Sequence, residues 1–171
     1  MTKTTLRFTL LAIASLSLAV HAADVQRQAE VAKQGEEVMP FSLAATTHIF
    51  TKTNDGGTQR VVAKNAANTE QVRLVRQHLR EIRTQFDKGD FSGPSHVHGD
   101  DMPGLQQLKT AGPGQIAIEY KDVAGGAELT YRTRNAKLVG TLHSWFDAQL
   151  SDHGADAVTG HMHDHGDMGR R

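Results

Sequence analysis

Alternation of apolar and polar residues predicts a β-hairpin in the first half of the chain. Residues 46–53 and 58–64 are rich in β-branched side chains and flank the turn sequence NDGG at 54–57. In the first strand, His48 and Phe50 point to the same side, because successive side chains alternate across a strand. If Phe50 lies in the core, His48 is therefore at least partly buried.

A second hairpin is predicted later in the chain. Residues 116–120 and 129–133 alternate in the same way, and the turn sequence AGG at 124–126 lies between them. A short helix at 105–109 is expected to precede this hairpin, because Gly and Pro residues follow it and end it.

Two longer stretches have the periodicity of amphipathic helices. The first runs from Asn68 or Thr69, either of which can cap it, to about Phe86, and the second runs from Asn135 to about Asp152. Their apolar stripes consist of Val72, Val75, Leu79, Ile82 and Phe86 in the first helix, and Val139, Leu142, Phe146 and Leu150 in the second.

The order of elements is therefore hairpin, helix, loop, hairpin, helix. We predict an α+β fold made of two ββα units, whose strands form one antiparallel sheet with the helices packed on one face. Trp145 lies off the apolar stripe of its helix. It is expected to cover a loop, line a pocket or contact a partner.

Residues 1–22 have the features of a secretory signal peptide. Lys3 and Arg7 precede an apolar run at 8–20, and small or tolerated residues follow at the cleavage site. The run is too short for a comfortable membrane span. We expect an exported, soluble, periplasmic protein that does not remain inserted in the membrane.

The rest of the chain divides into three parts. Residues 23–38 are polar with scattered small apolar residues, which predicts a flexible leader or a frayed helix. Residues 39–154 are expected to form the α+β domain. Residues 155–171 lack apolar periodicity and are predicted to be a disordered tail.

The charge balance argues against nucleic acid as a partner. The chain has 19 basic and 19 acidic residues, and loss of Lys3 and Arg7 with the signal peptide would leave 17 basic residues. The chain has no cysteine, which excludes disulfides and thiolate metal sites. Any metal ion must therefore be bound by histidine, methionine and carboxylate side chains.

Candidate metal ligands are concentrated in two segments. Residues 94–105, PSHVHGDDMPGL, contain Gly and Pro and are predicted to form an irregular loop rather than a helix. The end of the chain, GHMHDHGDMGRR, combines histidine with methionine, which suits copper in either oxidation state before zinc. The candidate metal ligands are His48, His96, His98, Met102, His143, His153, His161, Met162, His163, His165 and Met168.

These residues lead to three hypotheses. The first is a protein that binds or buffers copper or zinc through the tail and the central loop. The second is a small-ligand-binding protein or enzyme with a pocket near His48, His96, His98 and His143, in which Asp147, four residues after His143, orients that ring. The third is a protein-interaction module with Trp145 exposed at the contact. No nucleophile elbow, P-loop or dinucleotide-binding motif occurs, so catalysis is less favoured than binding.

Three segments are similar to a family of small exported bacterial proteins that are commonly labelled aspartate carbamoyltransferase. They are MPFSLAATTHIFTKTNDGGTQRVVAK at 39–64, HLREIRTQFDKGDFSGPSHVHGDDMPGL at 78–105 and LHSWFDAQLSDHG at 142–154. The resemblance covers residues 39–154 and implies that these elements form one domain. It assigns no site residues.

The sequence departs from the enzyme whose name this family carries. Aspartate carbamoyltransferases are longer chains with two α/β domains and a Ser-Thr-Arg-Thr phosphate-binding loop. Here the most similar string is YRTR at 131–134, which falls on a predicted strand. We therefore do not expect carbamoyl transfer.

Overall fold

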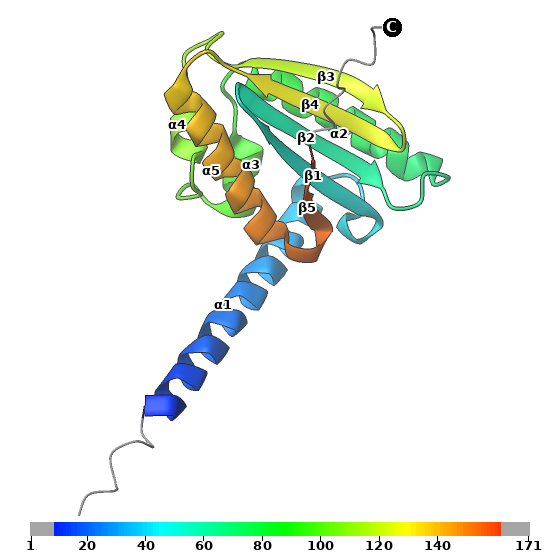
Figure 1. Cartoon of the computed structure of the whole chain (residues 1–171). Helices are drawn as coiled ribbons and strands as arrows, with labels where there is room; N and C mark the ends of the chain where they lie inside the picture. Colours follow the sequence, from blue (N-terminus) through cyan, green and yellow to red (C-terminus); the bar gives the residue numbers. More distant parts are fainter. Residues whose placement is uncertain (1–8, 162–171) are drawn as a thin grey trace, which may run out of the picture.

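A five-stranded sheet forms the centre of the domain (Figure 1). In this computed structural model, residues 9–161 are described, and their side chains are described from residue 22 onward. The strands have the order β3-β4-β2-β1-β5 across the sheet. They are β1 (Thr46–Thr53), β2 (Gly56–Ala63), β3 (Ala117–Val123), β4 (Gly126–Arg132) and β5 (Ala157–Thr159).

The two predicted hairpins are present and are joined into one sheet. β1 pairs with β2 and β3 pairs with β4, both antiparallel, and β2 pairs antiparallel with β4. The predicted α+β class with two ββα units is confirmed. The sheet is mixed rather than wholly antiparallel, because β5 pairs in parallel with β1, with His48 opposite Ala157.

Two long helices cover one face of this sheet. α2 (Thr69–Phe86) begins at Asn68, whose side chain accepts a hydrogen bond from the Gln71 N–H, and α5 (Ala136–His153) begins at Asn135. Both asparagines provide the predicted N-caps. α2 packs on β2, β3 and β4, while α5 packs on β1 and β2.

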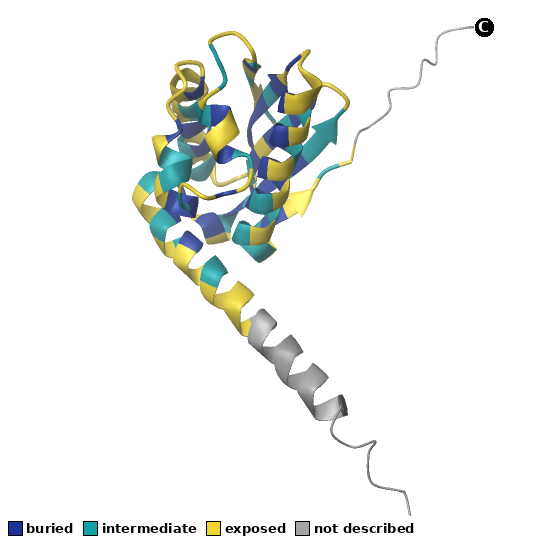
Figure 2. Cartoon of the chain, turned by 90° about the vertical axis from the view of Figure 1, so that its left-hand side faces the viewer, coloured by how far each residue is buried: buried dark blue, intermediate teal, exposed yellow. Residues whose placement is uncertain are grey.

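The core lies between the helices and the inner face of the sheet (Figure 2). Phe50 of β1, Val61 of β2 and Leu129 of β4 point into it and are almost fully buried. His48, which shares the inner side of β1 with Phe50, is also buried, as predicted. The opposite face of the sheet is polar; there, for example, Glu128 forms ion pairs with two basic side chains.

The buried face of α5 differs from the predicted stripe. Trp145 is only 1% exposed, and Gln149 is also buried, whereas Val139 and Leu150 are partly exposed. The helix is covered on a second side by the loop before α4 (Leu105–Lys109). In that loop, a side chain at Gly104 would approach the Thr141 carbonyl oxygen at 2.6 Å and the Trp145 Cβ at 3.0 Å. The burial of Trp145 also corrects the hypothesis of a tryptophan exposed for a protein contact.

The segment predicted as an irregular loop is partly helical. α3 (Ser92–His98) includes Pro94 in its first turn. Proline has no N–H, and in the first turn an N–H would have no acceptor within the helix, so proline is tolerated there. Gly99 follows with a positive φ of 81° and ends the helix. This local geometry turns His98 inward, where it is 4% exposed.

The chain on the N-terminal side of the domain is helical. α1 (Thr9–Val38) runs away from the domain in Figure 1, and its last turns pack against α3 and α5. Val31 is fully buried, so residues 23–38 are not the flexible leader that the sequence suggested. Among residues 9–161, no helix is both long and apolar enough to cross a membrane.

The start of the predicted tail is also ordered. Residues 154–156 form a short 3-10 helix, and residues 157–159 form β5. Gly160 then donates its N–H to the Phe50 carbonyl oxygen at 2.9 Å. The predicted disorder is therefore wrong for residues 155–160, because pairing with β1 satisfies backbone groups that the local sequence would leave free.

Candidate functional site: a histidine cavity

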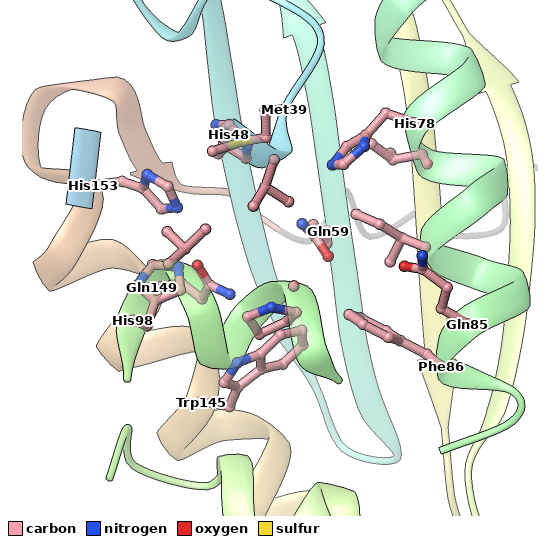
Figure 3. A pocket seen from close by; sticks show the side chains of 16 residues that line it. Met39, His48, Gln59, His78, Gln85, Phe86, His98, Trp145, Gln149 and His153 are labelled. Carbon is pink, nitrogen blue, oxygen red and sulfur yellow. The ribbon is translucent and has the colours of Figure 1, made fainter. Parts of the chain in front are cut away.

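A cavity of about 70 Å³ lies between the sheet and the helices (Figure 3). We call it the histidine cavity, because four histidines line it: His48 of β1, His78 of α2, His98 of α3 and His153 at the end of α5. Its other lining residues are Val38, Met39, Gln59, Leu79, Ile82, Gln85, Phe86, Gly93, Pro94, Val97, Trp145 and Gln149. Elements from both halves of the chain therefore build the site.

The His153 ring contacts two of the other three histidine rings. His48 and His153 stack with their centroids 4.8 Å apart and their planes at 5°. His98 meets His153 edge-on at 5.1 Å and 81°. His78 lies on the other side of the cavity, where it meets the Phe41 ring edge-on at 5.5 Å.

A chain of charged and polar groups fixes the His98 ring. His98 Nδ1 donates a hydrogen bond to Asp152 Oδ2 at 2.8 Å, and Arg27 of α1 donates to both carboxylate oxygens at 3.1 and 2.7 Å. Arg27 also donates to the His98 carbonyl oxygen at 2.7 Å. Burial opposes the ionised carboxylate, but the bonds from His98 and Arg27 outweigh it and lower the Asp152 pKa to about 2. Because Nδ1 bonds Asp152, Nε2 is the ring nitrogen of His98 that is not committed to this network.

The other cavity histidines are neutral at physiological pH. Burial is the main cause that lowers the His78 and His153 pKa values to about 4. Burial followed by the nearby histidines lowers the His48 pKa well below its usual value. His48, His78 and His153 therefore line the cavity as uncharged imidazoles.

Two buried nitrogens beside the cavity lack a hydrogen-bond partner among the described residues. They are His48 Nδ1 and Trp145 Nε1. As whole residues, His48 is 3% exposed and Trp145 is 1% exposed. Trp145 packs edge-on against Tyr131 at 5.8 Å and Phe86 at 6.0 Å, which holds the indole in place. An unsatisfied buried polar group costs about 1–3 kcal/mol. Both atoms are closed off from the cavity as well as from solvent, so a guest reaches them only if a side chain moves.

The structure brings three of the predicted metal ligands together, His48, His98 and His153, and places the others elsewhere. His96 is exposed and bonds Glu37 through Nε2 at 2.9 Å. Met102 is buried in the apolar core. His161 is exposed, and Met162, His163, His165 and Met168 lie outside the described residues.

The proposed pairing of His143 with Asp147 is wrong. His143 Nε2 donates to the carbonyl oxygens of Thr53 and Gly56 at 3.0 and 2.9 Å, which anchors α5 to the β1–β2 turn. Asp147 instead forms an exposed ion pair with Lys52 at 2.6 Å. Neither residue lines the histidine cavity.

The converging histidines are not arranged as a formed metal centre. Within residues 9–161, no group of three or more His, Asp or Glu side chains is placed to hold a metal ion. The stacking of His48 on His153 gives a physical reason, because the in-plane lone pairs of parallel rings do not meet at one point. Metal binding by this cluster would require a ring to rotate.

Sequence reasoning missed several residues of the cavity. His78 is not among the candidate residues taken from the sequence, yet it follows Leu74 by four residues and precedes Ile82 by four, which places the three side chains on one face of the helix. That spacing could have identified it. Gln59 and Gln149 gave no comparable signal, because their burial depends on which elements pack over them. Trp145 lines the cavity, which is one of the three roles that its position off the apolar stripe predicted.

The lining of the cavity favours binding over covalent catalysis. None of its described residues is serine, threonine, cysteine or lysine. The nucleophiles most often used by hydrolases are therefore missing from this lining. Comparisons with known proteins found no matching family model, no matching curated protein and no matching solved structure.

Proposed function

We propose that this chain is an exported protein that binds a small polar molecule in the histidine cavity. The observation that carries the proposal is one hollow of about 70 Å³, in which an apolar lining is interrupted by the four histidines and by Gln59 and Gln149. Binding sites combine an apolar lining with a few polar groups that fix the orientation of the ligand. Leu79, Phe86 and Val97 supply the apolar part here.

The size of the cavity limits the ligand. A water molecule needs roughly 10–15 Å³ of such volume, so the cavity has room for about five water-sized groups. Gln85 is exposed while Gln59 is buried, so the cavity reaches the surface on its α2 side. A compact molecule can enter there without a rearrangement of the sheet.

Export is part of the same proposal, through removal of residues 1–22 as a signal peptide. Arg27 and Gln28 bond α3 or α5, and Val31 is buried. All three residues follow Ala22 and stay in the chain when residues 1–22 are removed. The family resemblance over residues 39–154 adds no role for any of these side chains.

The protein carries its own reporter for a binding test. Trp145 is the single tryptophan of the chain and lines the cavity, so its fluorescence responds to a guest. The mature protein is titrated with neutral, anionic and cationic fragments of a few heavy atoms each. We expect a saturable change in Trp145 emission with at least one of these classes, and loss of the response in His48→Phe.

The matched control is His96→Phe, because His96 is exposed and outside the cavity. This variant should respond as the unchanged protein does. If no class of fragment changes the emission saturably, the cavity holds only water and the proposal is wrong.

Transition-metal binding, with copper before zinc, is a second proposal and belongs mainly to the tail. It is supported by the place where the tail begins. β5 pairs beside His48 on β1, and exposed His161 follows directly after Gly160. The tail therefore leaves the domain close to the His48–His153 pair. Metal binding by the tail itself would take place at the surface of the protein.

A further inference from the structure

The two edges of the five-stranded sheet are protected to different degrees. At one edge, β5 has only three residues, so it offers little backbone for pairing. At the opposite edge (Figure 1), β3 has seven residues, contains no proline and pairs with β4 in an unbroken register without a bulge. Shortness, proline and bulges are among the features that keep sheet edges from pairing with other chains. β3 has none of these three.

The outward backbone groups of β3 belong to every second residue. The pair that flanks the two-residue turn between β3 and β4 is hydrogen-bonded, and such pairs recur at every second residue along the strands. Ile118, Tyr120 and Asp122 therefore direct their N–H and C=O groups away from the sheet. Arg83 donates through Nε to the Ile118 carbonyl oxygen at 3.3 Å. The other outward groups of these three residues have no partner among the described residues.

α2 leaves this edge of the sheet open. The helix packs most extensively on β4, one strand further in, and contacts β3 and β2 on either side. The Arg80 side chain extends from it towards the edge, where its guanidinium lies 4.9 Å from the centre of the Tyr120 ring. A further strand can therefore be added beside β3 without displacing the helix.

The charges of β3 are complementary to a second copy of the same strand. If Tyr120 faces Tyr120 of the second copy in an antiparallel pair, Ile118 faces Asp122, and all three outward residues exchange hydrogen bonds. Glu119 then lies opposite Lys121 of the second copy, and Lys121 lies opposite Glu119. These side chains are 66% and 63% exposed. Opposite charges in directly opposed positions stabilise a pair of strands, and like charges destabilise it.

Neighbouring antiparallel registers lack this complementarity. A shift by two residues in one direction places Glu119 opposite Glu119, and a shift in the other direction places Lys121 opposite Lys121. Each shift also leaves one outward residue of each copy without a partner. A lone lysine on an edge strand discourages pairing, but here Glu119 supplies the opposite charge.

The helix side of β3 adds no unbalanced charge at the centre of this arrangement. Arg80 lies closest to the twofold axis, because that axis passes beside Tyr120. Arg80 and Arg76 both pair with Asp122 of their own chain, at 2.9 and 3.3 Å. The two copies of Arg80 therefore approach each other as paired groups.

Further from the axis, an acidic residue again meets a basic one. Asp122 of the second copy faces Ile118, so its carboxylate approaches Arg83, which stands beside Ile118 and also pairs with Asp87 at 3.0 Å. The Ile118 carbonyl oxygen has two lone pairs. It can accept from the second copy while the bond from Arg83 is kept.

We propose that two copies of this chain associate through β3, antiparallel and with Tyr120 facing Tyr120, so that their sheets become continuous. This inference concerns the surface of the domain and does not depend on the histidine cavity. The opposed residues form about six main-chain hydrogen bonds. Little side-chain area is buried, so the dimer dissociates on dilution.

Sedimentation velocity of the protein without residues 1–22 measures the association. We expect the mass to rise from that of one chain to that of two as the concentration increases. Lys121→Glu and Glu119→Lys should each weaken the dimer about tenfold or more, because each variant opposes like charges at two positions. An equimolar mixture of the two variants should associate again, because the glutamates of one chain face the lysines of the other.

Each result has a definite meaning. A mass of one chain at every concentration overturns the proposal, and so does an unchanged dimer in either single variant. Two monomeric variants that do not associate when mixed overturn the proposed register. Because Glu119 bonds Arg132 and Lys121 bonds buried Glu128 in the same chain, circular dichroism checks that both variants fold.

A matched pair of substitutions at Asp122 tests the backbone pairing. Asp122→Pro removes an outward N–H but no hydrogen bond to β4, and proline is tolerated at such positions of edge strands. Asp122→Ala removes the same carboxylate and keeps the N–H. The proline variant should dimerise about tenfold more weakly than the alanine variant. If the charge variants do not fold, this pair decides, because equal dimerisation of the two contradicts the proposal.

Discussion

At the scale of single residues, the histidines of this chain have different roles, which depend on how deeply each one is buried. His96 is exposed and forms an ion pair, and His143 donates to two carbonyl oxygens. His48, His78 and His153 are held as neutral rings around a cavity. The sequence could indicate burial of His48, because Phe50 shares its face of the strand. It could not indicate that His153, at the end of a helix, would stack on His48.

Acid should destabilise the protein through these neutral rings. The His78 pKa is about 4 in the folded state against 6.5 ordinarily, mainly because of burial and despite nearby Glu81. Between these values the unfolded chain binds more protons, so the free energy of unfolding falls as the pH drops from 6.5 towards 4. This single group is worth about 3 kcal/mol across that window.

The His78→Leu variant removes one titrating group, so its unfolding free energy should depend less steeply on pH in this window. Urea unfolding at a series of pH values measures the slope. His161→Ala is the control, because His161 is exposed, and it should keep the slope of the unchanged protein. Equal slopes for His78→Leu and the unchanged protein would contradict the role of burial. Asp152 does not affect this comparison, because it is present in the variant and in the unchanged protein and contributes equally to both slopes.

At the scale of elements, the sequence predicted what depends on local pattern and missed what depends on packing. The hairpin turn at 54–57 and the caps Asn68 and Asn135 are local signals, and all three are where they were expected. β5 has only three residues and lies among Gly and Asp, so it has no periodicity to detect. Its existence depends on an open edge of β1, which a sequence pattern does not reveal.

The contact between α5 and the first hairpin provides a test at this scale. His143→Ala leaves the carbonyl oxygens of Thr53 and Gly56 without their donor, which should lower the free energy of unfolding by about 1–2 kcal/mol. Chemical denaturation measures the loss, and amide hydrogen exchange should accelerate around the turn.

Asp147→Asn, one turn further along α5, is the matched comparison. Asp147 forms an exposed ion pair with Lys52, and exposed pairs contribute about 0.2–1 kcal/mol. Its substitution should therefore cost less than that of His143. An equal or larger cost for Asp147→Asn would show that the hairpin is not held through His143.

At the scale of the whole molecule, segments from both ends of the described chain complete the site. Arg27 of α1 fixes Asp152 and, through it, the His98 ring. Ala157 of β5 pairs with β1 opposite His48. The sequence placed residues 23–38 and 155–160 outside the domain, because both segments are polar and their contacts are with distant residues. The histidine cavity therefore could not have been assembled from local patterns.

The proposed metal-binding tail can be separated from the cavity by truncation. A chain that ends at Gly160 keeps β5 and loses residues 161–171, which contain five of the predicted ligands: His161, Met162, His163, His165 and Met168. Titration with Cu(I), Cu(II) and Zn(II) should show copper binding in the longer form and its loss in the truncated form. Trp145 emission and its response to fragments should be the same in both. Equal copper binding by the two forms would assign the metal site to the domain instead.

The parallel pairing of β5 with β1 has a consequence for how the chain folds during synthesis. The sheet places Ala157 opposite His48, so a nascent chain that is still on the ribosome lacks this strand until residue 157 has been added. Until then, the outer edge of β1 has unpaired backbone groups and can pair with strands of other molecules.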